Sequence, residues 1–470
     1  MKRHLLSLSV LLILLSGLTL TFTNVAHAET AGAQISSNCI NPNGTNTLHG
    51  TLGGANYTIA VPSNWNGTLV LYSHGYVFSS NPLNNPAPDA GDVLTGATLL
   101  NQGYALAGSS YSQNGWALQQ AFQDQIALLD FFDTTCGHPT RTLAWGHSLG
   151  GIITAGLVQL YPNRFAGALP MCGVLAGGIG TWNQALDSAF AFDVLLASNT
   201  LPVVHITNPS AAFNKAESIL GSAQNTPQGR ARIALAAALA DIPGWFDSAS
   251  SEPASKDFST QEQNQFLWES KVDFAFAFFA RAELEARAAG NPSWNTGVNY
   301  SKQLENSADY SEVVALYKQA GLHLDQDLGA LAAAPRIAAD PGAVAYLNNY
   351  ISFNGNLDIP VLTMHTTGDG LVSNQDEQAY ASVVRSAGDS SLLRQIFVHR
   401  AGHCAFTPAE TLSAFQTLIH RLDTGKWGGS TDPSLMNQEA AALGSTFNPA
   451  PPAFLAFEPT PFLRPFDVRN

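Results

Sequence analysis

Hydrophobic and polar positions alternate along this chain with two periods, one typical of buried strands and one typical of amphipathic helices. Short apolar runs that predict buried strands lie at 68–73, 104–109, 141–145, 360–365 and 392–398. Helical periodicity follows two of these runs, at 116–132 and 374–387. Because strands that alternate with helices form mostly parallel sheets covered on both faces, the predicted fold class is α/β.

The pattern changes between residues 175 and 356, where strand signals nearly vanish. Helical stretches dominate there, at 183–197, 229–239, 261–289, 311–320 and 341–350. This segment therefore predicts a large helical insertion between two parts of one sheet domain, residues 29–174 and 357–427. Residues 428–470 are rich in proline, which interrupts regular structure, so we expect an extended C-terminal arm.

One stretch of the insertion is strongly aromatic. Its aromatic residues are Phe266, Trp268, Phe274, Phe276, Phe278 and Phe279. Aromatic side chains at helical spacing usually form core, so packing against the sheet domain is the favoured interpretation and the lining of an acyl or aromatic pocket is the alternative. The charged end that follows contains Glu283 and Glu285, which fit a solvated helix face or, alternatively, a sensor for a substrate amine.

The most informative motif is a G-x-S-x-G, formed by residues 146–150. It lies between a predicted strand and an apolar stretch, 151–158, that predicts a helix. In that setting a serine occupies the apex of a sharp turn and exposes its hydroxyl. Ser148 is therefore the candidate nucleophile.

A serine hydroxyl needs a base that takes its proton, and the base needs an acid that orients it. Asp369 comes shortly after the strand 360–365, and His403 lies in a glycine-containing loop after the strand 392–398. The order serine, acid, histidine along the chain is that of one known arrangement of these three residues. The sequence therefore predicts a triad of Ser148, Asp369 and His403.

Other residues compete for the roles of base and acid. His399 lies at the strand end itself, from which Ser148 is harder to reach than from the loop of His403. Asp358 precedes its strand and so lies at the wrong edge of the sheet, whereas Asp376 falls inside the next predicted helix. His403 and Asp369 are the favoured base and acid for these reasons.

Acyl transfer also requires hydrogen-bond donors that face the developing oxyanion. The backbone N–H of Leu149, directly after the serine, is the first candidate. The second is the N–H of Tyr76, in the loop that follows the strand 68–73.

Four more residues lie beside the predicted site and could contact substrate. They are His74, His147, Ser110 and Tyr111. Structural hydrogen bonding is the alternative role for each of them.

Together these motifs resemble the α/β-hydrolase superfamily, over about residues 47–172 and 358–427. The resemblance implies an α/β-hydrolase fold in which residues 175–356 form a helical cap over the active site. Cys404, directly after His403, is similar to a feature of the tannase and feruloyl-esterase group, in which that cysteine is bridged to one beside the nucleophile. Here His147 occupies the position before Ser148, so half of that feature is absent.

The N-terminus resembles a secretory signal. Lys2 and Arg3 precede an apolar run over 5–22, and Ala26-His27-Ala28 is a small-residue cleavage site. We therefore expect a signal peptide over residues 1–28, cleavage after Ala28 and an exported protein without stable membrane insertion. An uncleaved membrane anchor is the alternative, because the apolar run is nearly long enough to span a bilayer.

The four cysteines of the chain fit two disulfides, since exported proteins commonly oxidise an even set of cysteines. Cys172 and Cys404 are both expected at the edge of the sheet that carries the triad, which favours a bridge between them. Cys39 and Cys136 would then form the second bridge. Free buried cysteines are the alternative, and the Cys and His spacing does not fit a zinc site.

Composition narrows the function classes further. A formal net charge of −14 disfavours nucleic acid as a partner. The sequence thus predicts a secreted serine hydrolase, without metal or cofactor, that cleaves small-molecule or polymer-derived carboxylic esters. The alternatives are a secreted aminopeptidase-like serine peptidase of the same fold and a non-catalytic binding protein, and the sequence does not indicate an oligomeric state.

Overall fold

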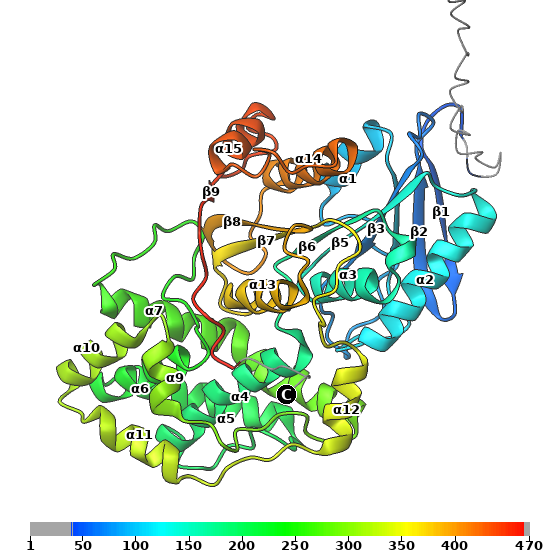
Figure 1. Ribbon diagram of the computed structural model, residues 1–470. Coiled ribbons are helices and arrows are strands. Elements are labelled where there is room, and N and C mark those ends of the chain that lie inside the picture. The colour runs from blue at the N-terminus through cyan, green and yellow to red at the C-terminus, as the bar shows by residue number, and fades with distance from the viewer. Residues whose placement is uncertain (1–38, 40, 465–470) are drawn as a thin grey trace, which may run out of the picture. The chain divides into compact units, whose positions relative to one another are not determined.

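A mixed sheet forms the centre of the computed structural model, which describes residues 39 and 41–464. Its nine described strands follow the order β1-β2-β4-β3-β5-β6-β7-β8-β9 (Figure 1). The strands are β1 Asn46–Leu52, β2 Ala55–Val61, β3 Thr68–Ser73, β4 Ala105–Ser109, β5 Arg141–His147, β6 Gly167–Met171, β7 Val361–Gly368, β8 Leu393–Ala401 and β9 Phe454–Leu455. Strands β4 through β8 of this order pair in parallel, and antiparallel strands border them on both sides.

Helices cover both faces of the sheet, because the parallel strands are apolar on both sides and must be shielded from water. All six residues of β3 are buried, for example. One face is covered by α2 Leu118–Thr135, α3 Leu149–Leu160 and α13 Gln375–Ala387, and the other by α1 Val93–Asn101 and α14 Pro408–Thr424 (Figure 1). This is the predicted α/β class, with the sheet and flanking helices of an α/β-hydrolase.

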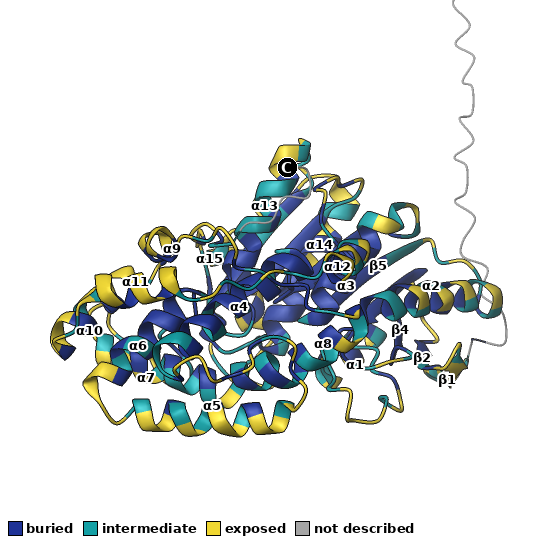
Figure 2. Ribbon diagram, turned by 90° about the horizontal axis from the view of Figure 1, so that it is seen from below, coloured by how far each residue is buried: buried dark blue, intermediate teal, exposed yellow. Residues whose placement is uncertain are grey.

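Residues 175–356, called the helical segment from here on, contain no strand among the described elements. Their α-helices are α4 Gly177–Leu195, α5 Pro209–Ala223, α6 Pro227–Ala238, α7 Phe258–Trp268, α8 Arg281–Ala288, α9 Tyr300–Asn306, α10 Tyr310–Ala320, α11 Leu324–Ala333 and α12 Pro341–Asn349. Between α7 and α8, residues 269–273 and 276–280 form two π-helical turns. The outer faces of α5 and α10 are exposed, while α4 and α6 are largely buried (Figure 2).

The helical segment packs around a hydrophobic core of its own but also shares core with the sheet. Phe192, Leu235 and Tyr317 belong to its own cluster. Leu284 and Leu347 belong instead to the cluster that includes α2 and α3. All described residues fall in one compact unit, so the predicted domain boundaries at 174 and 357 stay a prediction.

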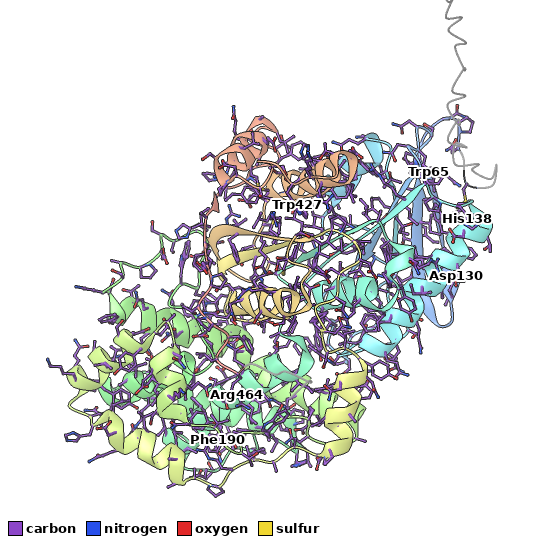
Figure 3. All side chains as sticks on the ribbon, in the orientation of Figure 1. Trp65, Asp130, His138, Phe190, Trp427 and Arg464 are labelled. Carbon is purple, nitrogen blue, oxygen red and sulfur yellow. A yellow bond between two sulfur atoms is a disulfide. The ribbon has the colours of Figure 1, made fainter. Side chains whose placement is uncertain are left out.

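The prediction of an extended arm over residues 428–470 is wrong in part. A helix, α15 Pro433–Ala442, interrupts the arm, and β9 adds a short antiparallel strand to β8. Pro433 is compatible with this helix because it occupies the first helical turn, where the missing N–H has no intrahelical partner anyway. Beyond β9 the chain reaches the helical segment, where Arg464 forms an ion pair with Asp187 on α4 at 2.6 Å (Figure 3).

Both predicted disulfides are present. Cys39 is bonded to Cys136 and Cys172 to Cys404, with Cα–Cα distances of 5.1 and 5.3 Å. The predicted signal peptide, residues 1–28, and its cleavage site lie outside the described residues. Within the described residues, no helix combines the length and the apolar character needed to span a membrane.

Candidate active site

Ser148 occupies a sharp turn between β5 and α3, as the motif predicts. Its backbone lies at φ 58° and ψ −123°, a conformation that L-residues rarely adopt. β3 can pass very close to this turn only because the two glycines have no side chain: a Cβ on Gly146 or on Gly150 would lie 2.5 or 1.9 Å from the carbonyl oxygen of Ser73. The two outer glycines of the motif are therefore required by backbone contact.

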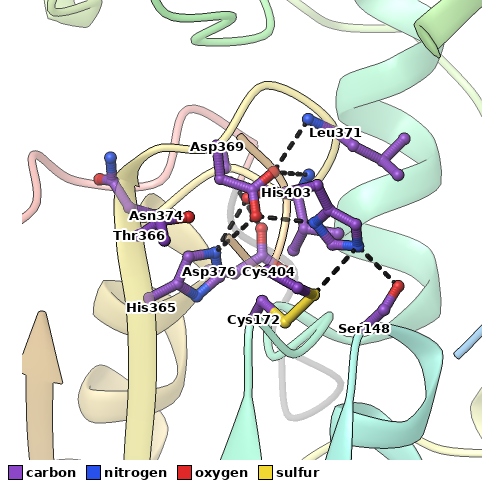
Figure 4. Close-up of polar contacts among 12 residues, drawn as sticks. Ser148, Cys172, His365, Thr366, Asp369, Leu371, Asn374, Asp376, His403 and Cys404 are labelled. Atoms are coloured by element: carbon purple, nitrogen blue, oxygen red, sulfur yellow. Dashed lines mark hydrogen bonds and ion pairs between the residues drawn. A yellow bond between two sulfur atoms is a disulfide. The ribbon is translucent and has the colours of Figure 1, made fainter. Parts of the chain in front are cut away.

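The predicted serine, histidine and aspartate form one hydrogen-bonded chain (Figure 4). His403 Nε2 lies 2.8 Å from Ser148 Oγ, and His403 Nδ1 lies 2.7 Å from Asp369 Oδ2. With Nδ1–H donating to the carboxylate, Nε2 is left to accept the serine proton; this tautomer follows from the hydrogen-bond network. The geometry meets the distance requirement for a general base acting on a serine.

Asp369 is fixed from its other side as well. Its second oxygen, Oδ1, accepts hydrogen bonds from the backbone N–H groups of Leu371 and Val372, at 3.1 and 3.0 Å. The side chain is fully buried, whereas that of His403 is 18 % exposed. Burial acts to raise the pKa of Asp369, but the neighbouring His403 and His365 outweigh it and hold the pKa below the usual range.

His365 is a buried partner of Asp369 that the sequence pattern does not identify. It lies in β7, where its Nε2–H donates to the carbonyl of Val372 at 3.0 Å and lies 3.6 Å from Asp369 Oδ2. Its Nδ1 lies 3.1 Å from Glu377 on α13. Burial opposes the charged imidazole, but the carboxylates of Asp369 and Glu377 outweigh burial and raise the pKa of His365 to about 10. The only available sequence signal was a histidine within a buried strand, four residues before the acid.

The rival residues lie elsewhere. His399 is on β8, where its ring packs against Trp245 at 5.0 Å and its Nε2 lies 3.4 Å from Glu252. Asp376, on α13, accepts a hydrogen bond from the backbone N–H of Ala176 at 2.9 Å. Asp358 is exposed ahead of β7. Neither His399 nor the two aspartates take part in the hydrogen-bonded chain of Ser148.

The loop after β3 runs directly beside Ser148. A Cβ on Gly75 would lie 3.3 Å from the Cβ of Ser148, so the backbone here is within contact distance of the serine. Tyr76 and Leu149 both line the same cavity as Ser148. The assignment of their N–H groups as oxyanion donors stays a prediction.

None of the four predicted substrate contacts is among the residues that line the cavity of Ser148. His74 and Tyr111 are buried and stack on each other with ring centroids 4.1 Å apart, and the hydroxyl of Tyr111 donates to the carbonyl of His74. Ser110 is buried and donates to the carbonyl of Tyr111. The ring of His147 lies 3.2 Å from the hydroxyl of Tyr72. These contacts fit the alternative structural role of the four residues, and their contact with substrate stays a prediction.

A cavity of about 120 Å³, partly open to solvent, lies over Ser148 between the sheet edge and the helical segment. Its wall is largely apolar, with Trp116, Trp182 and Ile242 among its members. The aromatic stretch of the helical segment divides between both interpretations, because Phe274 and Phe276 line the cavity while other members, such as Phe278, pack in the core. A concave and mostly apolar site of this kind suits part of a small-molecule ligand.

The Cys172–Cys404 disulfide anchors the loop that carries His403. Cys172 follows β6, and its N–H donates to the carbonyl of Met364 on β7 at 2.7 Å. Cys404 Sγ lies 3.5 Å from His403 Nε2 (Figure 4). The bridge therefore ties the histidine loop to the end of a central strand. Among the described residues, no cluster of histidine, cysteine or carboxylate side chains is arranged to hold a metal ion.

The sequence of this chain matches that of a known protein family. Residues 46–397 match the tannase-like family of unknown function (DUF6351). The chain is 29 % identical over 422 residues to an o-phthalyl amidase from Xanthobacter agilis, an alignment that covers 83 % of this chain and 89 % of the amidase.

Solved structures with a similar arrangement include two esterases. The rice cell wall degrading esterase LipA from Xanthomonas oryzae has 13 % identity and a TM-score of 0.38, over 81 % of this chain and 89 % of the esterase. Feruloyl esterase B from Aspergillus oryzae has 14 % identity and a TM-score of 0.38, over 81 % of each chain. The family match extends over most of the chain, so this chain belongs to the tannase-like family of unknown function.

Proposed function

We propose that this protein is a secreted serine hydrolase that cleaves carboxylic esters, with Ser148 as nucleophile, His403 as base and Asp369 as the acid that orients the base. The observation that carries the proposal is the pair of hydrogen bonds from Ser148 Oγ to His403 Nε2 and from His403 Nδ1 to Asp369 Oδ2, at 2.8 and 2.7 Å. This is the contact order that activates a serine hydroxyl.

The proposed reaction proceeds through an acyl-enzyme. Ser148 Oγ attacks the carbonyl carbon of the ester while His403 Nε2 takes the serine proton. His403 then gives that proton to the departing alkoxide as the carbon–oxygen bond breaks, which leaves the acyl group on Ser148. Water, deprotonated by His403, attacks the acyl-enzyme, and the acid product leaves as Ser148 regains its proton. Asp369 stabilises the imidazolium that forms in each half of the cycle.

The oxyanion of each tetrahedral intermediate needs donors on the side away from His403. The N–H groups of Leu149 and Tyr76 are the candidates, since Leu149 begins helix α3 and Tyr76 belongs to the loop that contacts Ser148. A helix N-terminus favours negative charge through its free N–H groups. Removal of one such donor in a serine protease lowers kcat by about 10²–10³.

Amide hydrolysis is a second candidate function, because the relative from Xanthobacter agilis is named an o-phthalyl amidase. The peptidase alternative, in contrast, loses its proposed amine sensor. Glu283 accepts from the N–H of Trp116 at 2.8 Å and pairs with Arg287 at 2.6 Å, while Glu285 accepts from the N–H of Ile206. Neither carboxylate lines the cavity that holds Ser148.

Export of the protein is supported by two features. The N-terminal 28 residues have the composition of a secretory signal, and both pairs of cysteines form disulfides, which persist mainly in oxidising compartments.

A hydrolysis panel tests the proposal. Residues 29–470 are assayed with p-nitrophenyl esters of increasing acyl length, a feruloyl ester, a phthalyl amide and aminoacyl p-nitroanilides, each in parallel with Ser148→Ala. Ester turnover that disappears in Ser148→Ala supports the proposal. Ser148-dependent turnover of the amides alone would favour the amidase, and turnover that persists in Ser148→Ala would contradict the assigned nucleophile.

A further inference from the structure

Two carboxyl side chains, Glu269 and Asp273, line the same cavity as Ser148. They stand at the two ends of the π-helical turn 269–273, directly after α7. Short π-helical turns within helices occur frequently at functional sites. The proposed reaction uses neither residue.

Neither carboxyl is satisfied by the protein. Both oxygens of Glu269 and Oδ2 of Asp273 are buried and have no hydrogen-bond partner among the described residues. Glu269 is 1 % exposed. Buried polar groups without a partner are rare in folded proteins and unfavourable, and a buried carboxylate without a partner is more unfavourable still. Such a group on a cavity wall indicates a partner that arrives with a ligand.

The charges around the two carboxyls are also negative. Burial raises the pKa of Glu269, and Asp273, Glu262 and Glu217 add to the effect. Burial likewise raises the pKa of Asp273, helped by Asp369. No lysine or arginine lines the cavity among the described residues, and Lys271, on the same turn, is exposed to solvent. This wall lacks positive charge.

The turn is held rigidly against the loop of Asp369. The ring of Trp268 packs on Gly370 so closely that a Cβ there would lie 2.3 Å from Trp268 Cδ2. The indole N–H of Trp268 also donates to the carbonyl of Trp245 at 3.0 Å. Phe274 and Phe276 continue the cavity wall beyond the two carboxyls, so an apolar or aromatic body fits beside them. The carboxyls are therefore held in a fixed relation to the Ser148 site.

We propose that Glu269 and Asp273 form a subsite for a protonated amine, so that the substrate is an ester or amide with an ammonium group on an aromatic or aliphatic body. This inference rests on the proposed function for its role in turnover, but not for the binding itself. An ammonium supplies both the missing positive charge and up to three N–H donors. A hydroxyl group offers one donor without charge, and a carboxylate would meet like charge.

Ligand binding tests the subsite without any turnover. Calorimetry on the full mature chain compares benzylamine, at a pH at which it is protonated, with benzyl alcohol and benzoate, which are similar in size. Benzylamine is expected to bind about tenfold more tightly than the other two, the difference of a charge-assisted hydrogen bond. Glu269→Gln and Asp273→Asn should each remove this preference.

Glu285→Gln is the matched control, since Glu285 is a buried carboxyl on helix α8 that neither lines the cavity nor is among the groups that raise the pKa of Glu269 or Asp273. It should keep the preference for benzylamine, and circular dichroism with thermal melting verifies that each variant is folded. Equal or weaker binding of benzylamine than of benzyl alcohol, no measurable binding of benzylamine, or unchanged binding in both folded cavity variants would overturn the subsite.

Kinetics separate failure of the subsite from failure of the proposed function. The p-nitrophenyl esters of 4-(aminomethyl)benzoate and 4-ethylbenzoate differ only in an ammonium against a methyl group. A kcat/KM about tenfold higher for the aminomethyl ester, lost in Glu269→Gln, is the expected result. Ser148-dependent hydrolysis of both esters at equal rates would overturn the subsite alone, while preferential binding of benzylamine without any Ser148-dependent hydrolysis would overturn only the ester hydrolase.

Discussion

The two walls of the cavity over Ser148 differ in whether their buried carboxyl groups have hydrogen-bond partners. On the sheet side, the carboxylate oxygens of Asp369 have partners in His403, Leu371 and Val372. On the side of the helical segment, Glu269 is buried as deeply but has no partner among the described residues. The hydrogen bonds of the buried carboxylate on the sheet side are therefore formed before substrate binds, whereas those of Glu269 are not.

We infer from this difference that the sheet side carries out the reaction and that the helical side recognises the substrate. A base and its acid must be preorganised, since their geometry has to be correct at the moment of proton transfer. A recognition wall can leave groups unsatisfied, because the ligand completes them and loses its partners again on release. If this division is right, changes on the sheet side should reduce turnover of every substrate, and changes on the helical side should alter the choice among substrates.

The largest effect is expected from His403→Ala. Loss of the base should lower kcat by about 10⁴–10⁶, close to the effect of Ser148→Ala, because members of a triad act as a unit. His399→Ala is the matched control, since His399 packs against Trp245 away from Ser148. Steady-state kinetics on one p-nitrophenyl ester suffices, and an active His403→Ala with a silent His399→Ala would show that the base is misassigned.

Asp369→Asn should follow, with a loss in kcat of about 10³–10⁴. The amide cannot accept from His403 Nδ1–H as a carboxylate does, so the imidazole loses both its tautomer and the charge that stabilises its protonated form. The same substitution at Asp358, an exposed residue ahead of β7, should leave kcat unchanged. Equal rates for wild type and a folded Asp369→Asn would contradict the assigned acid.

His365→Gln should affect stability more than chemistry. Loss of a buried ion pair partner beside Asp369 and Glu377 costs about 3–5 kcal/mol in free energy of unfolding. The pKa of His365 is raised to about 10, from about 6.5 in an unfolded chain. Its stabilisation is therefore complete below about pH 6.5 and is lost as the pH rises through 10.

Urea unfolding between pH 6 and 10 measures this contribution. The gap in unfolding free energy between wild type and His365→Gln should narrow steadily as the pH rises. A gap that is independent of pH would mean that His365 is neutral and acts through packing alone.

The smallest effect is expected from the disulfide beside the histidine loop. Replacement of Cys172 and Cys404 by alanine should cost about 2–4 kcal/mol in stability. Turnover should fall less than in the substitutions above, because the hydrogen bonds of His403 to Asp369 and Ser148 remain available. The Cys39–Cys136 pair, whose second cysteine caps the end of α2, is the matched control, and its removal should lower the melting temperature without changing kcat.

Much of the sheet side was predictable from the sequence. The strand 68–73 coincides with β3, and the residues of the hydrogen-bonded chain were found from the motif and the order of the strands. The place of such a residue follows from its own strand alone, because a residue directly after a parallel strand lies at the edge of the sheet where the strands end. Helix α14 was not predicted, although the capping box of Thr407 and Glu410 at its start is a sequence signal for a helix.

The helical side was less predictable for a physical reason. A single regular helix over 261–289 assumes one period throughout, but the two π-helical turns, 269–273 and 276–280, shift the faces on which later residues lie. The periodicity therefore could not place Glu269 and Asp273 on a cavity wall. The partnership of His365 with Asp369 was not predicted either. The raised pKa of His365 depends also on Glu377, which belongs to another element, α13.

The role of Ser148 as nucleophile is tested most directly by identifying the residue that a serine-reactive probe modifies covalently. The mature chain is treated with an alkyl fluorophosphonate, which bonds to an activated serine, then digested and examined by mass spectrometry. One adduct is expected, on the peptide that contains Ser148, and it should be absent in His403→Ala. An adduct on another residue, or none on a chain that hydrolyses esters, would contradict Ser148 as the nucleophile.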